Sequence, residues 1–305
     1  MKLGKRIVAC RIPILILALA LLIPSVIGMA ATRINYDMLT YLPDDIDTVT
    51  GQDILMDEFG KGAFSFVIVE GMAPKDVSTL REQIEQIDHV DSVLWYDSFA
   101  DVSIPMEMLP KKYYDAFNAG DDTMLAVFFD SSTSADETMT ALSQIKQVAG
   151  KQCFVTGMSA LVTDLKDLCE QEEPVYVGLA VALACVAMML FMDNWIIPFV
   201  FLISIGMAIL LNMGTNIFLG EVSYLTKALA AVLQLAVTMD YSIFLWHSYE
   251  EEKTTHENKK EAMAVAINKT FTSVIGSSIT TVAGFIALCF MSYTLGLDLG
   301  IVMAK

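Results

Sequence analysis

The chain has 305 residues, of which 55% are hydrophobic and 18% are charged, and this composition is too apolar for a soluble protein of its length. The formal net charge of −17 is concentrated between Arg33 and Glu173, where 9 Lys and Arg residues stand against 27 Asp and Glu residues, a balance of −18. A segment this acidic repels nucleic-acid phosphates, so nucleic acid is not expected as a partner.

The N-terminus predicts a membrane anchor. Residues 12–30 form a continuous apolar run, and about 20 apolar residues are needed to cross ~30 Å of hydrocarbon. Basic residues precede this run and should keep residues 1–11 in the cytoplasm; they are Lys2, Lys5, Arg6 and Arg11. A cleaved signal peptide has an apolar core of about 7–15 residues, so an uncleaved first helix is the better interpretation. Residues 31–173 would then lie outside the cytoplasm.

Residues 31–173 have the alternating and amphipathic patterns of an α+β domain. Strands are expected over 64–70, 92–96, 124–129 and 152–156, and helices over 74–87 and 135–148. The order βαβ followed by βαβ predicts a split, ferredoxin-like arrangement. Such folds have many functions, so this domain by itself does not indicate one.

Two of the five cysteines, Cys153 and Cys169, lie in the acidic segment and could form a disulfide outside the cytoplasm. No CxxC pair or Cys/His spacing accompanies them, so free thiols are preferred and no metal or redox cofactor is expected. Cys10, Cys185 and Cys289 lie in or beside apolar runs and are expected to pack as small apolar residues.

Residues 174–305 predict four more membrane helices and the truncated start of a sixth. The helices are expected over about 175–192, 195–219, 225–247 and 271–293, and the sixth apolar run begins after Gly296. Residues of about 248–270 are expected to form a cytoplasmic helix along the membrane surface, with an acidic start that argues against a strong site for anionic lipids. The predicted fold class is an α-helical polytopic membrane protein with an extracytoplasmic α+β domain.

Asp240 is the principal functional candidate. It lies in the fourth predicted span, about seven residues or ~10 Å from the cytoplasmic end, which is too deep for so short a side chain to reach the interface. An ionisable group in hydrocarbon is costly unless it is paired or hydrated, and such groups mark ion or substrate routes. The alternative is a structural carboxyl that pairs with a polar neighbour and holds the helices in register.

Polar residues accompany Asp240. Tyr241 follows it directly, and Gln234, Thr238 and Tyr241 form one stripe at spacings of four and three residues. Possible supporting hydroxyls in the next span are Ser277, Thr280 and Thr281. Small residues recur every four positions in that span, a pattern that lets helices approach closely, so packing is preferred there to a direct role in proton transfer.

Four other polar residues of the spans have structural explanations. Lys227 and Asp298 lie near the external ends of their spans, where placement at the interface accounts for them. Asn212 and Asn216 share one helix face and are expected to form interhelical hydrogen bonds rather than to bind a ligand.

Several motifs carry a family resemblance. Residues 239–245, MDYSIFL, are followed by YEEE at 249–252, and YLPDD occurs at 41–45 after the first span. With the Glu-Ala pair at 261–262, these motifs resemble the mycobacterial-membrane-protein-large (MMPL) branch of the resistance-nodulation-division superfamily. The similarity covers nearly the whole chain. Met239 departs from the pattern, because the family commonly has Gly before the Asp.

The resemblance implies a porter-like external domain and a proton relay formed by Asp240 and Tyr241. Family members usually contain two six-span repeats with facing Asp-Tyr pairs, so this chain is expected to be the N-terminal half of a two-repeat transporter. A homo-oligomer would also bring two Asp-Tyr pairs together, in the way that the two internal repeats common in transporters do.

The expected function is export of lipid-like or amphiphilic molecules across the plasma membrane, driven by the proton-motive force. Membrane lipids or the hydrophobic substrate would be the partners, together with the missing second half or further copies of the chain. A lipid sensor similar to sterol-sensing domains and a Sec-linked accessory of protein translocation are the alternatives. No nucleophile triad, Gly-rich phosphate loop or metal cluster is present in the sequence, so neither an enzyme nor a cofactor is expected.

Overall fold

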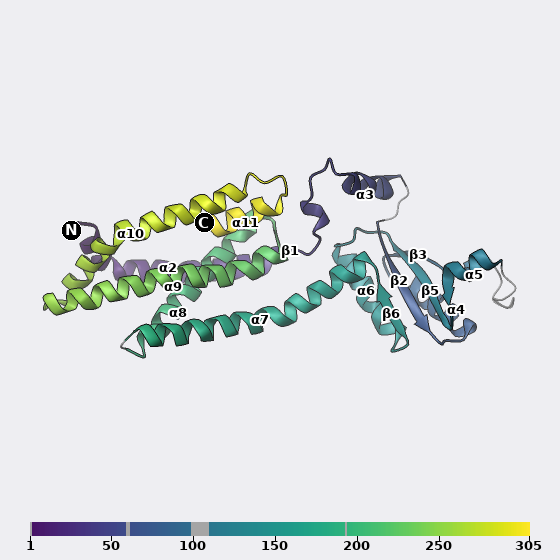
Figure 1. The fold of residues 1–305 in the computed structure, drawn as a ribbon, viewed down its shortest axis with the longest axis horizontal. Helices are drawn as coiled ribbons and strands as arrows, with labels where there is room; N and C mark the ends of the chain where they lie inside the picture. The colour runs from purple at the N-terminus through teal and green to yellow at the C-terminus, as the bar shows by residue number, and fades with distance from the viewer. Residues whose placement is uncertain (1, 59–61, 99–109, 193) are drawn as a thin grey trace. The chain divides into compact units, whose positions relative to one another are not determined.

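The computed structural model describes residues 2–58, 62–98, 110–192 and 194–305 (Figure 1). The chain divides into two compact units. The membrane unit contains the residues up to Asn35 and those from Glu170 to Lys305, and the α+β unit contains Tyr36–Cys169. The helix α7 (Met158–Phe191) begins in the α+β unit and continues into the membrane unit.

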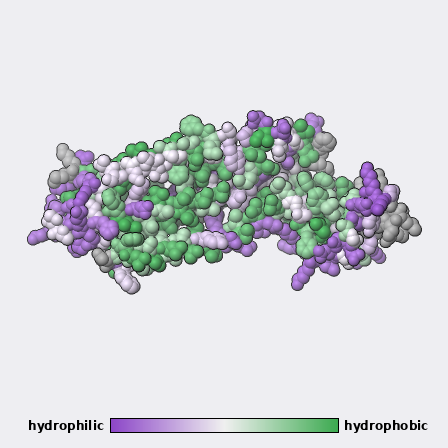
Figure 2. Space-filling view, viewed as in Figure 1, coloured by the Kyte–Doolittle hydropathy of each residue, from purple (hydrophilic) through white to green (hydrophobic). Residues whose placement is uncertain are grey.

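Five helices of the described residues are long and apolar enough to cross a membrane, which confirms the predicted number of complete spans. They are α2 (Arg11–Ala31), α7, α8 (Ile197–Gly214, extended by a 3-10 turn over Thr215–Leu219), α9 (Tyr224–Thr255) and α10 (Lys259–Leu288). Apolar side chains cover much of their surface in Figure 2. The protein is therefore a multi-pass membrane protein.

Short elements complete the membrane unit. Helix α1 (Lys2–Ala9) precedes α2 and packs against α10, and α11 (Leu295–Ala304) packs against α10 and α9. Strand β1 (Arg33–Asn35), which follows α2, pairs in parallel with β7 (Glu221–Ser223), which precedes α9. The sequence patterns did not predict this two-stranded sheet.

The structure corrects the helix expected over about 248–270. Helix α9 continues to Thr255 and α10 begins at Lys259, so this stretch is the junction of two long helices and not a separate helix. The side chain of Asn258 caps α10 by accepting a hydrogen bond from the backbone N–H of Lys260 at 3.0 Å. A polar cap followed by good helix formers therefore starts the next membrane helix directly.

All six elements predicted for the α+β unit are confirmed, with shifted ends. They are β2 (Ala63–Glu70), α4 (Pro74–Glu85), β3 (Val90–Leu94), β5 (Asp122–Phe129), α6 (Asp136–Ala149) and β6 (Cys153–Thr156). The unit also contains α3 (Asp47–Asp57), α5 (Lys111–Phe117), β4 (Asn118–Ala119) and short 3-10 turns at Leu39–Tyr41 and Tyr96–Ser98. The sheet has the order β3-β5-β2-β6 with antiparallel neighbours, and β4 pairs with β5.

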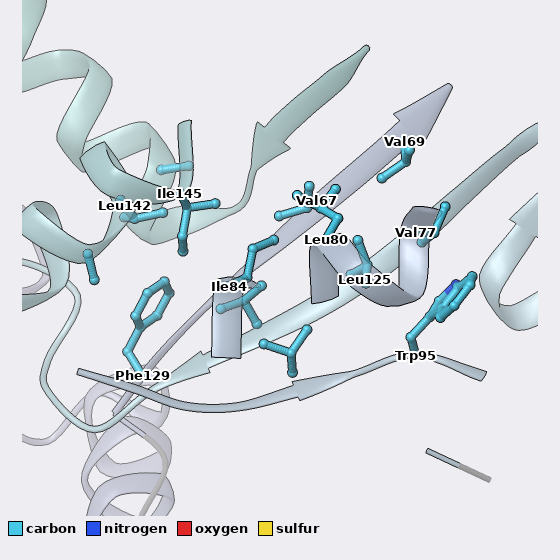
Figure 3. Close-up of a cluster of buried hydrophobic side chains, with 14 of the residues drawn as sticks. Val67, Val69, Val77, Leu80, Ile84, Trp95, Leu125, Phe129, Leu142 and Ile145 are labelled. Carbon is cyan, nitrogen blue, oxygen red and sulfur yellow. The ribbon is translucent and has the colours of Figure 1, made fainter. Parts of the chain in front are cut away.

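The core of the α+β unit lies between the sheet and the helices α4 and α6 (Figure 3). Residues of β2 alternate between buried and more exposed positions because successive side chains of a strand point to opposite faces. Trp95 is fully buried, and its indole N–H donates to Thr123 Oγ1 at 2.8 Å, which satisfies the one polar atom of the ring. The unit thus has a hydrophobic core of its own.

Truncation of this core should destabilise the α+β unit. Leu125 is fully buried, so Leu125→Ala is expected to lower its free energy of unfolding by about 2–5 kcal/mol through lost apolar contacts and a cavity. Amide hydrogen exchange of β2 and β5 in the full chain measures the change. Leu161 is 53% exposed, and Leu161→Ala is the matched control, with a much smaller effect expected. Equal effects of the two variants would contradict this placement of the core.

All five cysteines have free thiols in the structure, including Cys153 and Cys169. Cys153 lies in β6 and is partly buried against the core, and this burial raises the pKa of its thiol.

Candidate functional site

Helix α9 places Asp240 halfway along its length. The helix starts at Tyr224 and ends at Thr255, so Asp240 lies about 24 Å from the first residue and about 22 Å from the last at 1.5 Å per residue. The helix begins at a well-formed cap, where Ser223 Oγ accepts a hydrogen bond from the backbone N–H of Leu225 at 3.2 Å. The continuous helix therefore holds the carboxylate far from both of its ends.

The side chain of Asp240 is exposed on the surface of the helix bundle. Among the described residues it forms no hydrogen bond and no salt bridge. The expected alternative, a carboxyl paired with a polar neighbour within this bundle, therefore has no support in the structure of this chain. An exposed carboxylate at this depth requires water or a further polar group beyond the described residues.

Tyr241 points in another direction. Neighbouring residues of an α-helix are about 100° apart around its axis, so the side chains of Tyr241 and Asp240 leave α9 in different directions. The hydroxyl of Tyr241 donates to Ser277 Oγ at 3.5 Å, and the hydroxyls of Ser278 and Thr281 are also close enough to interact with it. Tyr241 of α9 therefore contacts hydroxyl-bearing residues of α10.

A cavity of about 180 Å³ adjoins Tyr241 between α8, α9, α10 and α11. Its polar lining residues come from three of these helices and from the chain end, and they are Asn212, Gln234, Thr238, Tyr241, Ser278, Thr281 and Lys305. A water molecule occupies about 30 Å³ in the liquid, so the cavity has room for several. The stripe Gln234, Thr238 and Tyr241 thus lines one polar space, whereas Asp240 lies outside its lining.

The structure brings together only part of the predicted set of hydroxyls. Thr281 lines the cavity, and its hydroxyl donates to the backbone oxygen of Ser277 at 3.0 Å. Thr280 is exposed on another face of α10, and its hydroxyl donates to the same oxygen at 2.8 Å, away from Tyr241. Ser278 lines the cavity and was not predicted. Its spacing of three residues from Thr281 is the signal that could have identified it.

Asn212 forms the interhelical hydrogen bonds that were expected. Its Nδ2 donates to Gln234 Oε1 at 3.0 Å and to the backbone oxygen of Val302 at 3.1 Å, which links α8 to α9 and α11. Its Oδ1 is buried and has no hydrogen-bond donor among the described residues. Asn212 therefore presents an acceptor at the cavity, which Gln234, Thr238 and Tyr241 also line.

Lys227 and Asp298 have specific partners in addition to their positions near the starts of α9 and α11. Lys227 Nζ lies 2.8 Å from Glu173 Oε2, an ion pair that joins α9 to α7. Asp298 Oδ2 accepts from the backbone N–H of Ser223 at 2.7 Å and from Thr226 Oγ1 at 2.8 Å. Asp298 of α11 therefore satisfies free N-terminal donors of α9, where a negative charge is favourable.

Comparison with known proteins relates the chain to membrane transporters. The model of the MMPL family matches residues 127–304. The chain is 26% identical over 182 residues to the siderophore exporter MmpL5 of Mycobacterium tuberculosis, a match that covers 57% of this chain and 19% of the relative. It is 25% identical over 162 residues to the probable transport protein MmpL4 of Mycobacterium leprae, covering 52% of this chain and 17% of the relative.

An archaeal relative matches over a greater share of its length. The putative membrane protein MJ1562 of Methanocaldococcus jannaschii is 20% identical over 331 residues, covering 96% of this chain and 85% of the relative. The match to the two mycobacterial relatives, in contrast, spans less than a fifth of their lengths.

Proposed function

Because the chain belongs to the MMPL family, we propose that it is part of a transporter of the resistance-nodulation-division type, in which protons moving through Asp240 and Tyr241 drive the export of lipid-like or amphiphilic molecules. The observation that carries this proposal is the position of Asp240, at the middle of a membrane helix and without a hydrogen bond or salt bridge among the described residues. Intramembrane carboxylates mark ion routes more often than they serve packing.

The polar cavity beside Tyr241 supports a proton route that begins at the neighbouring residue, Asp240. Tyr241 contacts the hydroxyl of Ser277, and the cavity that it lines continues to Gln234 and Asn212. Hydroxyl and amide groups at these positions can donate and accept hydrogen bonds, and water in the cavity would connect them. In this proposal Asp240 holds the proton, and Tyr241 with the polar cavity transfers it.

In the proposed topology the protein lies in the plasma membrane, with its N-terminus in the cytoplasm and the α+β unit outside the cytoplasm. The basic residues before α2 favour this orientation. The strand order β3-β5-β2-β6, with antiparallel neighbours and the two helices α4 and α6, agrees with a ferredoxin-like, porter-like domain. We propose domain limits of 12–30 for the first span, 31–173 for the outer domain and 174–305 for the remaining helices.

Water or a second polar group must face Asp240, because its carboxylate lies on the open surface of the bundle. In a two-repeat transporter this chain would be the N-terminal half, and the second half would cover that surface. In a homo-oligomer a second copy of the chain would do so. Family membership favours transport over the lipid sensor, the Sec-linked accessory and an enzymatic role.

Transport can be tested with membrane vesicles that contain the complete gene product. A pH gradient is imposed, and export of a fluorescent amphiphile is followed together with a pH-sensitive dye. Coupled export consumes the gradient faster when the amphiphile is present, and a protonophore stops both signals. Export that persists after the gradient has been dissipated would contradict proton coupling, and no movement of any amphiphile would contradict the exporter itself.

Removal of the Tyr241 hydroxyl should slow proton transfer without emptying the site. Tyr241→Phe keeps the ring and removes the contact to Ser277, so export is expected to fall by about 100-fold or more. Initial rates in the vesicle assay measure the effect. Tyr249→Phe is the matched control on the same helix, because Tyr249 does not line the polar cavity and should keep its rate. Equal rates for the two variants would remove Tyr241 from the route.

A further inference from the structure

Two adjoining cavities open at the end of the bundle where α1 and α2 meet the start of α10. The smaller has a volume of about 470 Å³ and a polar lining that includes Lys5, Arg11, Asn258 and Lys260. The larger has a volume of about 740 Å³ and is lined mainly by apolar side chains of α1, α2, α8 and α10. Val8, Arg11 and Lys260 line both cavities, so the polar and the apolar space are continuous.

The positive charges at this junction are largely uncompensated. Arg11, Lys259 and Lys260 form no salt bridge with any of the described residues. Lys5 is the exception, because its Nζ lies 3.8 Å from Glu261 Oε1. Three free cations beside one ion pair leave a net positive site that favours an anion.

The start of α10 adds to this preference. The positive end of its helix dipole lies there, although the backbone N–H groups of Lys260, Glu261 and Ala262 are already bonded to Asn258. Gly4 brings α1 close to the same helix: its backbone N–H donates to Asn268 Oδ1 at 3.2 Å, and a Cβ at Gly4 would lie only 2.1 Å from the Ala264 backbone oxygen. This close contact holds the basic N-terminus against the start of α10.

The larger cavity has the character of an acyl-chain site. Its walls include Leu15 and Ala18 of α2, Ile203 and Met207 of α8 and Met263 of α10. An aromatic cluster lies at the same end of the bundle, where the ring centroid of Trp246 is 5.4 Å from that of Tyr249 and 6.4 Å from that of Phe201. Trp and Tyr prefer the level of lipid headgroups, which is the level at which a lipid phosphate lies.

We propose that this junction binds an anionic phospholipid, with its phosphate between Arg11 and Lys260 and one acyl chain in the apolar cavity. This proposal departs from the expectation that the acidic start of the 250–269 stretch argues against a strong site for anionic lipids. The acidic residues Glu251 and Glu252 are instead engaged by Lys269, at 2.6 and 3.5 Å. The site does not depend on transport, and it would tie α1, α2, α8 and α10 together.

Lipid binding to the purified full chain in detergent tests the proposal. Native mass spectrometry compares phosphatidylglycerol with phosphatidylcholine of the same acyl chains. The wild-type chain should retain phosphatidylglycerol at least about tenfold better, and the double variant Arg11→Gln/Lys260→Gln should lose that preference, since each cation at a membrane surface contributes about fivefold. Equal retention of the two lipids by the wild-type chain would overturn the proposal.

Arg6→Gln is the control, because it removes a cation at the same end of the bundle that lines neither cavity. It should keep the preference for phosphatidylglycerol, and a loss equal to that of Arg11→Gln/Lys260→Gln would mean that general surface charge causes the preference.

Ala18→Phe fills the apolar cavity with the cations intact and should weaken phosphatidylglycerol binding. Unchanged binding would contradict the acyl-chain site. An excess of inorganic phosphate should not displace the lipid, and complete displacement would identify free phosphate as the ligand.

Discussion

Asp240→Asn is expected to abolish proton-driven export by the complete gene product. Asparagine keeps the size and the hydrogen-bonding capacity of aspartate but cannot take up and release a proton in the physiological range. If the carboxylate carries each transported proton, the initial rate of export in vesicles should fall by at least about 100-fold. The fluorescent-amphiphile assay with an imposed pH gradient measures this rate, and the amount of folded protein in the membrane is measured in parallel.

Two further variants make the result specific. Asp240→Glu keeps a titrating group at nearly the same place and should retain part of the rate. Thr280→Val changes an exposed residue whose hydroxyl bonds only to its own helix in the structure, and it should leave the rate unchanged. Normal export by Asp240→Asn, with normal insertion, would make Asp240 a structural residue and would favour the sensor or accessory function.

Gly214→Ala is expected to separate α2 from α8. A Cβ at Gly214 would lie 2.3 Å from Ser25 Cα and 2.4 Å from its backbone oxygen, and a Cβ at Gly28 would lie 2.3 Å from the Gly214 backbone oxygen. These atoms belong to backbones and cannot rotate away, so the two helices must shift apart. We expect a loss of about 2–3 kcal/mol of stability, measured as a lower midpoint of thermal unfolding in detergent.

Gly206 provides the control within the same helix. Nothing among the described residues lies within 4 Å of a Cβ built at Gly206, and alanine is the better helix former. Gly206→Ala should therefore leave the unfolding midpoint unchanged or raise it slightly. A similar decrease for Gly206→Ala and Gly214→Ala would show that the contact between α2 and α8 is not what the substitution disrupts.

The sequence by itself determined the elements of this protein. Runs of about 20 apolar residues predicted the five complete membrane helices, because the cost of exposing polar groups to hydrocarbon is decided locally along the chain. Alternating and amphipathic patterns likewise predicted β2, α4, β3, β5, α6 and β6, because their periods follow from strand and helix geometry. Asp240 was recognisable as a candidate from its depth in an apolar run alone.

Only the tertiary structure decided which of these residues meet. The rotation of α9 against α10 brings Tyr241 to Ser277 and leaves Asp240 on the open surface, although the two residues are adjacent in sequence. Packing of α1 on α10 brings Arg11 and Lys260 to the lining of the same two cavities, where local charge counting saw only an acidic stretch. The hydropathy of a segment depends on that segment alone. The face that a helix presents to a neighbour depends instead on close contacts between residues far apart in the chain, such as the contact of Gly214 with Ser25.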